Sequence, residues 1–196
     1  AVAQNVGMLA LTDHDTIAGI AEAKQHAKSQ PIELIAGVEI SILWEGKSIH
    51  LAALNIDETN ADLVELLNTQ AKLRQERAEL IGQKLEKAGI LNAYQGAKAL
   101  AHGEVTRAHY ARFLVSQGYA RNDEHAFKRY LGMGKSAYVK PVWCSLEEAV
   151  RATHLAGGLI CIAHPLRYKV TAKWIRRLIA DFKQAGGDGI EVAGCA

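Results

Sequence analysis

Apolar runs alternate with helical patterns in the first part of the chain. Residues 6–11 form an uninterrupted apolar run, the pattern of a strand buried on both faces, and polar side chains follow it directly. Thr16 can cap a helix that continues to Ser29, and Pro31 marks the next boundary. Residues 32–40 predict a second strand. This order of elements is typical of an α/β fold.

A hairpin is expected after the second strand, because two short apolar segments, 42–44 and 48–54, flank Glu45-Gly46. Glu39 would then lie near the end of the second strand. His50 would lie on the returning strand of the hairpin.

The pattern becomes helical in the middle of the chain. A long helical segment covers residues 62–89, and no strand pattern follows it before residue 140. We therefore predict an inserted helical domain at residues 61–140, within the usual size of a small domain. Its shorter helical patterns lie at 93–101, 107–117 and 123–131.

The α/β pattern resumes after this insertion. Ser145 and Glu148 form a capping-box pattern for a helix that Gly157-Gly158 ends. A strand at 159–163 would then deliver His164. The remaining predictions are a helix at 171–185, a strand at 189–192, and an α/β part made of residues 1–60 and 141–196.

Composition limits the class of protein. The 196 residues are 49% hydrophobic and 22% charged, which suits one sizeable or two small globular domains. A formal net charge of +2 is too balanced to indicate duplex DNA or a membrane as a partner, so any anion site must be local. Cys144, Cys161 and Cys195 form no C-x-x-C pair, which disfavours a disulfide framework and a cysteine zinc site and fits a reducing cytoplasm. No apolar run is long enough to span a membrane.

Imidazoles and carboxylates collect where strands are predicted to end. Asp13-His14, Glu39 and His164 each lie at such a point, and His50 belongs to the adjoining hairpin. Because the carboxyl ends of parallel strands share one edge, loops there can bring distant residues together. This donor set suits divalent Mn, Fe or Zn. A carboxylate in an apolar stretch also needs a partner, and a metal is one such partner.

Each of these residues also has a simpler interpretation. A single histidine after a strand more often caps the chain or forms a hydrogen bond than binds a metal. His164 precedes Pro165 and could simply end its strand. Cys161 lies in an apolar run, where a thiol is normally inert. The other histidines are assigned as surface or packing residues (His26, His125, His154) or left undecided (His102).

Several motifs together resemble the PHP (polymerase and histidinol phosphatase) family of metal-dependent phosphoesterases. The first group is Leu11-Thr12-Asp13-His14-Asp15, Gly37-Val38-Glu39-Ile40-Ser41, Ile49-His50-Leu51 and Ala163-His164-Pro165. A second group is similar to the branch that acts as a nucleoside 3′,5′-bisphosphate phosphatase and a 5′-to-3′ exoribonuclease on short RNA. It comprises Arg74-Gln75-Glu76-Arg77-Ala78, residues 106–115 and Gly134-Lys135-Ser136-Ala137-Tyr138-Val139.

The resemblance implies a distorted (β/α)7, TIM-like barrel with two or three metal ions. Manganese is the first candidate, with iron and zinc as alternatives. His14, Glu39, His50 and His164 would be ligands, and Asp13 would support a ligand or cap the loop. The family pattern also has an H-x-H on the first strand and a D-x-H on a late strand, and neither is found on a predicted strand of this sequence. Because such a barrel takes about 250 residues, we interpret the chain as the middle part of a larger phosphoesterase.

The same resemblance implies that the insertion binds substrate phosphates. Arg77, Arg107, Lys135 and His109 are the candidates, and Arg can grip a phosphate through two parallel hydrogen bonds. Arg74, Lys84 and Lys87 are instead expected to be solvated surface cations. The expected partner is a small nucleotide or a short single-stranded RNA.

The predicted activity is a metal-dependent phosphoesterase, in which a metal-activated water attacks phosphorus. The chain has no G-x-S-x-G elbow and no P-loop motif. Two alternatives remain open. One is a PHP phosphatase for another small phosphate monoester such as histidinol phosphate, and the other is a non-catalytic metal- or nucleotide-binding module.

Overall fold

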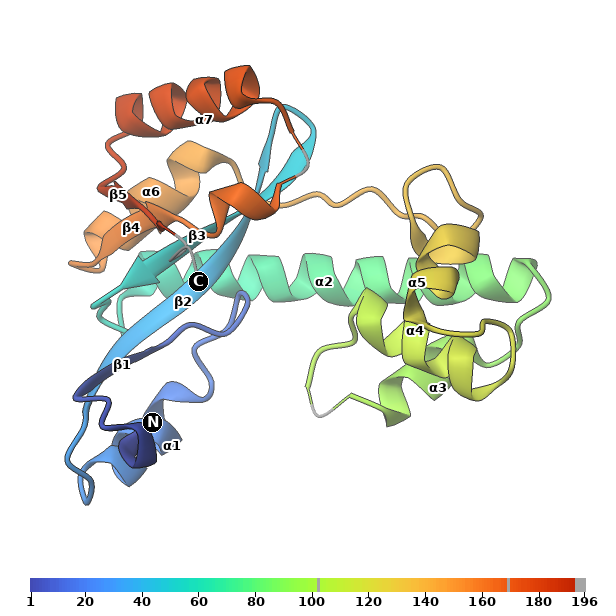
Figure 1. The fold of residues 1–196 in the computed structure, drawn as a ribbon, viewed down its shortest axis with the longest axis horizontal. Helices are drawn as coiled ribbons and strands as arrows, with labels where there is room; N and C mark the ends of the chain where they lie inside the picture. Colours follow the sequence, from blue (N-terminus) through green and yellow to red (C-terminus); the bar gives the residue numbers. More distant parts are fainter. Residues whose placement is uncertain (102, 169, 193–196) are drawn as a thin grey trace. The chain divides into compact units, whose positions relative to one another are not determined.

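The protein is a mixed α/β chain that divides into two compact units. A computed structural model describes residues 1–101, 103–168 and 170–192 (Figure 1). The first unit comprises Ala1–Gln70 and Trp143–Ala196, and the second comprises Ala71–Val142. The predictions about His102 and Cys195 fall outside the described residues.

A five-stranded mixed sheet forms the first unit, with the strands in chain order. Strand β3 runs antiparallel to both of its neighbours, whereas the outer pairs are parallel. Within the part of the chain that the structure describes, the two outermost strands do not pair with each other, so a closed barrel is not confirmed. The strands are β1 (Met8–Leu11), β2 (Glu33–Trp44), β3 (Lys47–Leu54), β4 (Leu159–Ile162) and β5 (Gly189–Ile190).

Strand β2 is one continuous strand of 12 residues. The sequence predicted two strands here, and Glu39 therefore lies in the middle of β2 and not near its end. The predicted hairpin is confirmed: Glu45 and Gly46 have φ angles of 46° and 73°, as a tight two-residue turn requires. In the resulting register, Ser41 lies opposite His50.

Two local predictions are wrong at the start of the chain. Strand β1 is not buried on both faces, since Met8 is 60% and Leu9 41% exposed; it is an edge strand that pairs only with β2 among the described strands. Thr16 does not cap helix α1 (Ile20–Ala27), whose N-cap is Gly19. The Thr16 hydroxyl accepts a hydrogen bond from the Ala18 N–H (3.2 Å) and so stabilises a turn before the helix.

Helices α1, α6 (Leu146–Leu155) and α7 (Ala172–Gln184) contribute to one hydrophobic core with the sheet. The predicted capping box of α6 is present, with the Glu148 N–H donating to the Ser145 hydroxyl at 3.2 Å. Gly157 ends this helix with a φ of 70°, in the left-handed region. The core includes Ile40, Leu51, Ile160, Leu178 and Phe182. Two short 3₁₀ turns, η1 (Val2–Gln4) and η3 (Pro165–Arg167), complete the elements of this unit.

The second unit is helical, and the structure describes no strand between residues 71 and 142. Helix α2 (Ala61–Lys87) begins in the first unit and ends in the second. The other elements are α3 (Ala93–Ala99), α4 (Arg107–Ser116), α5 (Asp123–Ala126) and a π-helical turn, η2 (Phe127–Leu131). They enclose a separate core that includes Ile81, Leu85, Tyr110, Leu114 and Leu131.

None of the helices that the structure describes is long and apolar enough to cross a membrane.

Candidate metal centre

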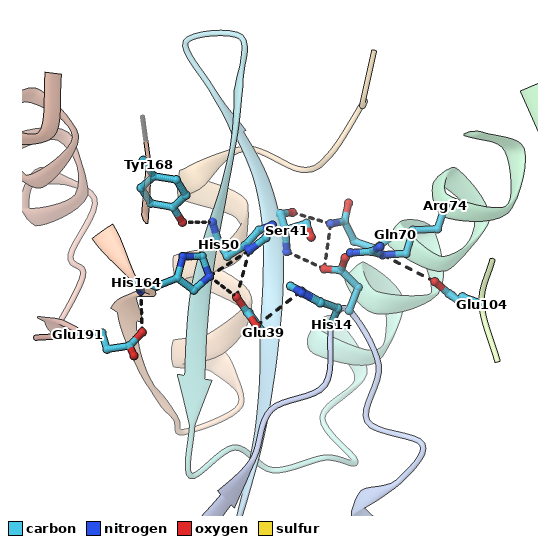
Figure 2. Close-up of polar contacts among 11 residues, drawn as sticks. His14, Glu39, Ser41, His50, Gln70, Arg74, Glu104, His164, Tyr168 and Glu191 are labelled. Carbon is cyan, nitrogen blue, oxygen red and sulfur yellow. Dashed lines mark hydrogen bonds and ion pairs between the residues drawn. The ribbon is translucent and has the colours of Figure 1, made fainter. Parts of the chain in front are cut away.

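The Glu39 carboxylate lies among three histidine rings (Figure 2). Its Oε1 is 2.9 Å from Nε2 of His164 and 3.1 Å from Nδ1 of His50, and its Oε2 is 3.6 Å from Nδ1 of His14. The Glu39 side chain is 18% exposed. The structure thus brings together all four residues that the sequence nominated as metal ligands.

The backbone of the sheet explains this convergence. After β1 the chain continues alongside β2, with the Glu39 N–H donating to the Asp13 carbonyl (3.0 Å) and the Asp15 N–H donating to the Glu39 carbonyl (2.9 Å). This pairing sets His14 beside Glu39. His50 lies on the next strand, two positions from the residue that faces Glu39.

His164 reaches the same point through an unusual backbone conformation. Its φ of 33° and ψ of 53° lie in the left-handed region, which is unfavourable for a residue with a side chain. Because Pro165 follows, an extended conformation would normally be preferred here. The His164 N–H donates to Oε2 of Glu191 at 2.6 Å, which helps to hold this conformation. Strain of this kind is characteristic of functional sites.

The electrostatics of the cluster keep Glu39 ionised. Burial would raise the pKa of the Glu39 carboxyl, but hydrogen bonds from His50 and His164 and electrostatic attraction to His14 and His50 lower it to about 2. The Tyr168 hydroxyl accepts a hydrogen bond from the His50 backbone N–H at 2.9 Å. Burial raises the pKa of Tyr168 to about 12, so the phenol stays neutral at physiological pH.

These donors suit a divalent cation. Nδ1 of His50 and Nε2 of His164 are 3.3 Å apart and face the same carboxylate oxygen. Ligand atoms of His14, Glu39 and His50 all lie within 4.8 Å of one another. In addition, Nδ1 of His164 is buried and has no hydrogen-bond partner among the described residues. Imidazole and carboxylate groups in one cluster are the ligands of Zn, Mn and Fe sites. The donor set therefore supports a divalent metal.

Residues 1–139 match the PHP domain family. The chain belongs to this family. It is 61% identical over 195 residues to a 5′-3′ exoribonuclease of Haemophilus influenzae, covering 100% of this chain and 71% of that protein. It is 42% identical over 195 residues to a 3′,5′-nucleoside bisphosphate phosphatase of Chromobacterium violaceum, covering 98% of this chain and 68% of that protein. The two activities predicted from the motifs, exoribonuclease and nucleoside bisphosphate phosphatase, thus appear in the names of these PHP relatives.

Solved structures of PHP-type proteins have the same fold. A protein from C. violaceum, described as an amidohydrolase with bound sulfate and no metal, superposes with a TM-score of 0.90 at 40% identity, over 96% of this chain and 67% of that one. A candidate metal-dependent phosphoesterase from Bifidobacterium adolescentis gives a TM-score of 0.81 at 25% identity, over 96% of this chain and 68% of that one. The resemblance to the PHP family predicted from the sequence is therefore confirmed.

The predicted phosphate-binding residues of this PHP chain lie in the second unit but not all together. Arg77 and Arg107 are half-buried neighbours: burial, with the nearby positive charge of Arg107, lowers the pKa of Arg77 to about 10. Lys135 instead lines a separate pocket. Nδ1 of His109 accepts a hydrogen bond from the Thr106 N–H (3.0 Å) in the capping box of α4, so a substrate contact would have to come from Nε2.

The assignment of Arg74 as a solvated surface cation is wrong. Its side chain is only 15% exposed, and its Nε lies 3.7 Å from Oε2 of Glu104. The alternation of charge along α2 did not reveal this, because burial here depends on a residue 30 positions away in the sequence. Lys84 is exposed, and its ammonium donates to the Tyr138 carbonyl at 2.6 Å.

A buried polar network beside the cluster was not predicted. Asp15 is 1% exposed, and its Oδ1 accepts hydrogen bonds from the Ser41 N–H (2.6 Å) and the Gln70 amide (3.3 Å). The same amide donates to the Ser41 carbonyl at 2.6 Å, and its oxygen accepts from the Cys144 N–H at 3.0 Å. The one available signal was that Asp15 directly follows His14. Ser41 ends the motif at residues 37–41 but was given no role there, and Gln70 lies in none of the motifs.

Proposed function

We propose that this chain belongs to a metal-dependent phosphoesterase that removes the 3′-phosphate from nucleoside 3′,5′-bisphosphates and releases mononucleotides from the 5′ end of short RNA. The observation that carries the proposal is the Glu39 carboxylate surrounded by His14, His50 and His164, in a chain that is 42–61% identical to relatives with these activities in their names. The complete fold would be the distorted (β/α)7 barrel of the family, and the location would be the cytoplasm. The free thiols of Cys144 and Cys161 are consistent with that location.

The four residues of the cluster would be ligands in a site that holds two or three divalent ions in the complete fold, with manganese as the first candidate. Bound ions of this kind lower the pKa of a metal-bound water and neutralise charge on phosphate oxygens. The chain's own contribution is to fix the ligands. Glu39 remains a carboxylate at any physiological pH, and the Tyr168 hydroxyl and Glu191 carboxylate hold the backbone at His50 and His164.

Arg77 and Arg107 would bind substrate phosphate. Burial lowers the pKa of both half-buried guanidinium groups, and the charge of Arg107 lowers the pKa of Arg77 further, so both cations gain from a nearby anion. The guanidinium of Arg107 lies over the Phe127 ring at 5.6 Å, which leaves its N–H edge available for a bidentate contact. His109 and Lys135 complete the proposed set of phosphate-binding residues. The bound sulfate in the similar C. violaceum structure is in keeping with a protein of this fold that accepts tetrahedral oxyanions.

Metal binding tests the centre directly. We expect stoichiometric Mn²⁺ binding by calorimetry after removal of metal with EDTA. Glu39→Gln should weaken this binding by more than the roughly 10- to 100-fold loss caused by removing a group that only supports a ligand. Glu33→Gln is the matched control, because Glu33 is exposed on the same strand. Equal Mn²⁺ affinity for wild type and Glu39→Gln would contradict the assignment.

Substrate preference tests the activity. With Mn²⁺, kcat/KM for adenosine 3′,5′-bisphosphate should exceed that for AMP roughly 10-fold or more, since one charge-assisted hydrogen-bonded contact supplies about 1.5–3 kcal/mol. Arg107→Gln should remove this preference. Arg112→Gln, which changes an exposed arginine on the same helix, should keep it.

Two outcomes would favour the alternatives. Faster hydrolysis of histidinol phosphate than of the bisphosphate would indicate a phosphatase for another small monoester. Stoichiometric metal binding without turnover of any phosphate ester would indicate a non-catalytic binding module.

A further inference from the structure

The second unit has a basic pocket of which the proposed phosphate-binding set uses only one residue, Lys135. Its volume is about 610 Å³, within the range of small-ligand sites. The lining includes Arg121, Glu124, His125, Lys128, Arg129 and Lys135. We refer to it as the basic pocket. Neither Arg77 nor Arg107 lines it, so it is distinct from the arginine pair proposed above.

Local structure explains why these side chains gather. Asn122 caps α5 by accepting the His125 N–H at 2.8 Å, and the His125 ring in turn accepts the Arg121 N–H at 3.2 Å. The chain then enters the π-helical turn η2, which closes with the Gly132 N–H donating to the Phe127 carbonyl at 2.8 Å. A Cβ at Gly132 would lie 2.7 Å from that carbonyl oxygen, so this close approach requires glycine. Single π-helical turns of this kind occur often at functional sites.

A glycine loop then returns the chain to the pocket. Gly134 has a φ of 74°, and the Lys135 N–H donates to the Gly132 carbonyl at 3.0 Å. This tight turn sets Lys135 on the same pocket as residues 121–129. The pocket is therefore held by backbone hydrogen bonds and is not a chance grouping of long side chains.

The charge of the basic pocket is unbalanced. Four cations line it against one carboxylate, Glu124, although the whole chain has a formal net charge of only +2. Among the residues that the structure describes, no ion pair involves Arg121, Lys128, Arg129 or Lys135. Cations concentrated in a concave surface without local counter-charges attract anions.

The distribution of these cations favours a polyanion over a single phosphate. All four are on exposed residues around an open pocket and do not converge on one buried point. Arg121 and Arg129 add planar groups that can stack on bases as well as bind phosphates. A flexible, singly stranded nucleic acid fits this combination of cations and stacking groups.

We propose that the basic pocket binds the sugar-phosphate backbone of the RNA substrate at nucleotides beyond the one being released. This inference rests on the proposed exoribonuclease function and adds a length-dependent RNA contact to it. Bisphosphates have no such backbone, so their binding does not depend on Arg121, Lys128 or Arg129. The pocket therefore raises the affinity for RNA more than the affinity for nucleotides.

Binding without turnover tests this inference. In EDTA, fluorescence anisotropy would measure the affinity of the full chain for 5′-phosphorylated oligoribonucleotides of 2 and 12 nucleotides across a salt series. The double variant Lys128→Gln/Arg129→Gln should bind the 12-mer about 10-fold more weakly at 0.1 M salt. The slope of log K against log salt should fall by about 1.4, since each phosphate contact to a single strand contributes about 0.7. Affinity for the 2-mer should stay within about twofold.

The control is Lys87→Gln/Lys98→Gln, which removes two exposed cations of the same unit outside the pocket. An equal loss in this control, or an unchanged 12-mer affinity in the pocket variant, would overturn the inference. Preference of the pocket for a poly-glutamate peptide over the 12-mer would also overturn it and would indicate an acidic protein partner. A loss of kcat/KM for the bisphosphate as large as the loss of RNA affinity would assign the pocket to the nucleotide site instead. Because RNA binding is measured without turnover, the two failures are distinguishable. A chain that binds RNA but turns over no substrate would contradict the proposed function, whereas an active chain whose pocket variant binds the 12-mer normally would contradict this inference alone.

Discussion

His164 shows how one residue can combine strain and function. Its left-handed backbone costs about 1–3 kcal/mol in a non-glycine residue. Glycine would remove this cost, but it would also remove the imidazole that contacts Glu39 at 2.9 Å. The surrounding contacts from Glu191 and His50 hold the conformation. At this position the fold therefore retains an unfavourable backbone together with the imidazole that faces Glu39.

The contact between His154 and Asp188 makes the free energy of unfolding depend on pH. Nε2 of His154 lies 3.0 Å from Oδ2 of Asp188, and the Ile160 N–H donates to the same oxygen at 2.8 Å. The hydrogen bond from His154 contributes most to lowering the pKa of Asp188 below its usual value. A carboxyl with a lowered pKa stabilises the fold above its unfolded pKa of about 3.9, and this stabilisation is lost as pH falls through the folded pKa.

Asp188→Asn should therefore reduce the free energy of unfolding at pH 6, and the difference from wild type should shrink below about pH 4. Because both side chains are more than one third exposed, the effect at pH 6 should stay below about 1 kcal/mol. Urea unfolding between pH 3 and 7 measures it. His154→Gln should remove the same pH-dependent part, and a pH-independent difference in either variant would contradict the explanation.

At the scale of single residues, the sequence revealed a charged side chain in an apolar stretch. It did not reveal residues whose burial depends on partners far away in the sequence. Glu39 attracted attention because a carboxylate stood between Val38 and Ile40. Asp15 did not, although it is more deeply buried. Its partners Ser41 and Gln70 lie 26 and 55 positions away, so no local pattern could reveal that its carboxylate would be satisfied.

Gln70 connects several elements of the first unit. Its side chain is 1% exposed and links the Ser41 carbonyl on β2 to the Cys144 N–H, just after the chain returns from the second unit. It also donates to Asp15, next to the ligand candidate His14. One amide thus ties together the start of α2, the centre of the sheet and the returning segment.

Gln70→Ala should destabilise the first unit by about 3 kcal/mol, because the Cys144 N–H loses the hydrogen bond to the Gln70 amide oxygen. A buried group left unsatisfied costs about 1–3 kcal/mol, to which the lost volume adds. Chemical unfolding followed by tryptophan fluorescence measures the loss. Gln83→Ala changes an exposed glutamine of the same helix and should stay within about 0.5 kcal/mol of wild type. Similar losses for the two variants would show that the network has no special role.

Gly96 tests packing against intrinsic propensity in helix α3. Alanine is favoured over glycine in helices by about 1 kcal/mol, yet a Cβ at Gly96 would lie 2.1 Å from Cε2 of Phe113 on α4. Overpacking of this kind costs about 1–3 kcal/mol. Gly96→Ala should therefore lower the stability of the second unit by about 1 kcal/mol in thermal unfolding followed by circular dichroism.

The matched experiment for this prediction is a double-mutant cycle with Phe113→Leu, which removes the aromatic ring that a Cβ would meet. If the clash is the cause, Gly96→Ala should become neutral or stabilising in the Phe113→Leu background. An unchanged cost in that background would mean that the backbone conformation, and not the ring, requires glycine.

At the scale of elements, the sequence predicted most helices and strands within a few residues. The main error was to divide β2 at residue 41, where Ser41 interrupts the apolar pattern. Ser41 is nevertheless buried, at 1% exposure, because its backbone groups meet Asp15 and Gln70. The other error, burial of β1, came from assuming neighbours on both sides of a strand that is an edge among the described elements.

At the scale of the whole molecule, the motifs predicted that four ligand candidates from four segments would meet. Each strand-end position was weak evidence alone, and their convergence depended on the resemblance to a family. The closed barrel could not be derived in the same way, because closure depends on strand pairings that no motif encodes. The described sheet has five strands in chain order, and its two outermost strands do not pair with each other.

The two separate hydrophobic cores give a prediction for the unfolding of the molecule. All three tryptophans (Trp44, Trp143 and Trp174) belong to the first unit, so tryptophan fluorescence reports on that unit alone, whereas circular dichroism reports on both. Leu114 is fully buried in the core of the second unit. Leu114→Ala should cost about 2–5 kcal/mol and lower the midpoint of part of the circular dichroism signal, while the midpoint of tryptophan fluorescence stays unchanged.

Leu51→Ala, in the core of the first unit, should have the opposite effect and move the fluorescence midpoint. Mn²⁺ should raise the fluorescence midpoint of the wild type, because a ligand stabilises the unit whose native state binds it. The competing expectation is that α2, which runs from one unit into the other, couples them into one cooperative transition. Coincident shifts of both probes in every variant would establish that coupling and would contradict independent unfolding of the two cores.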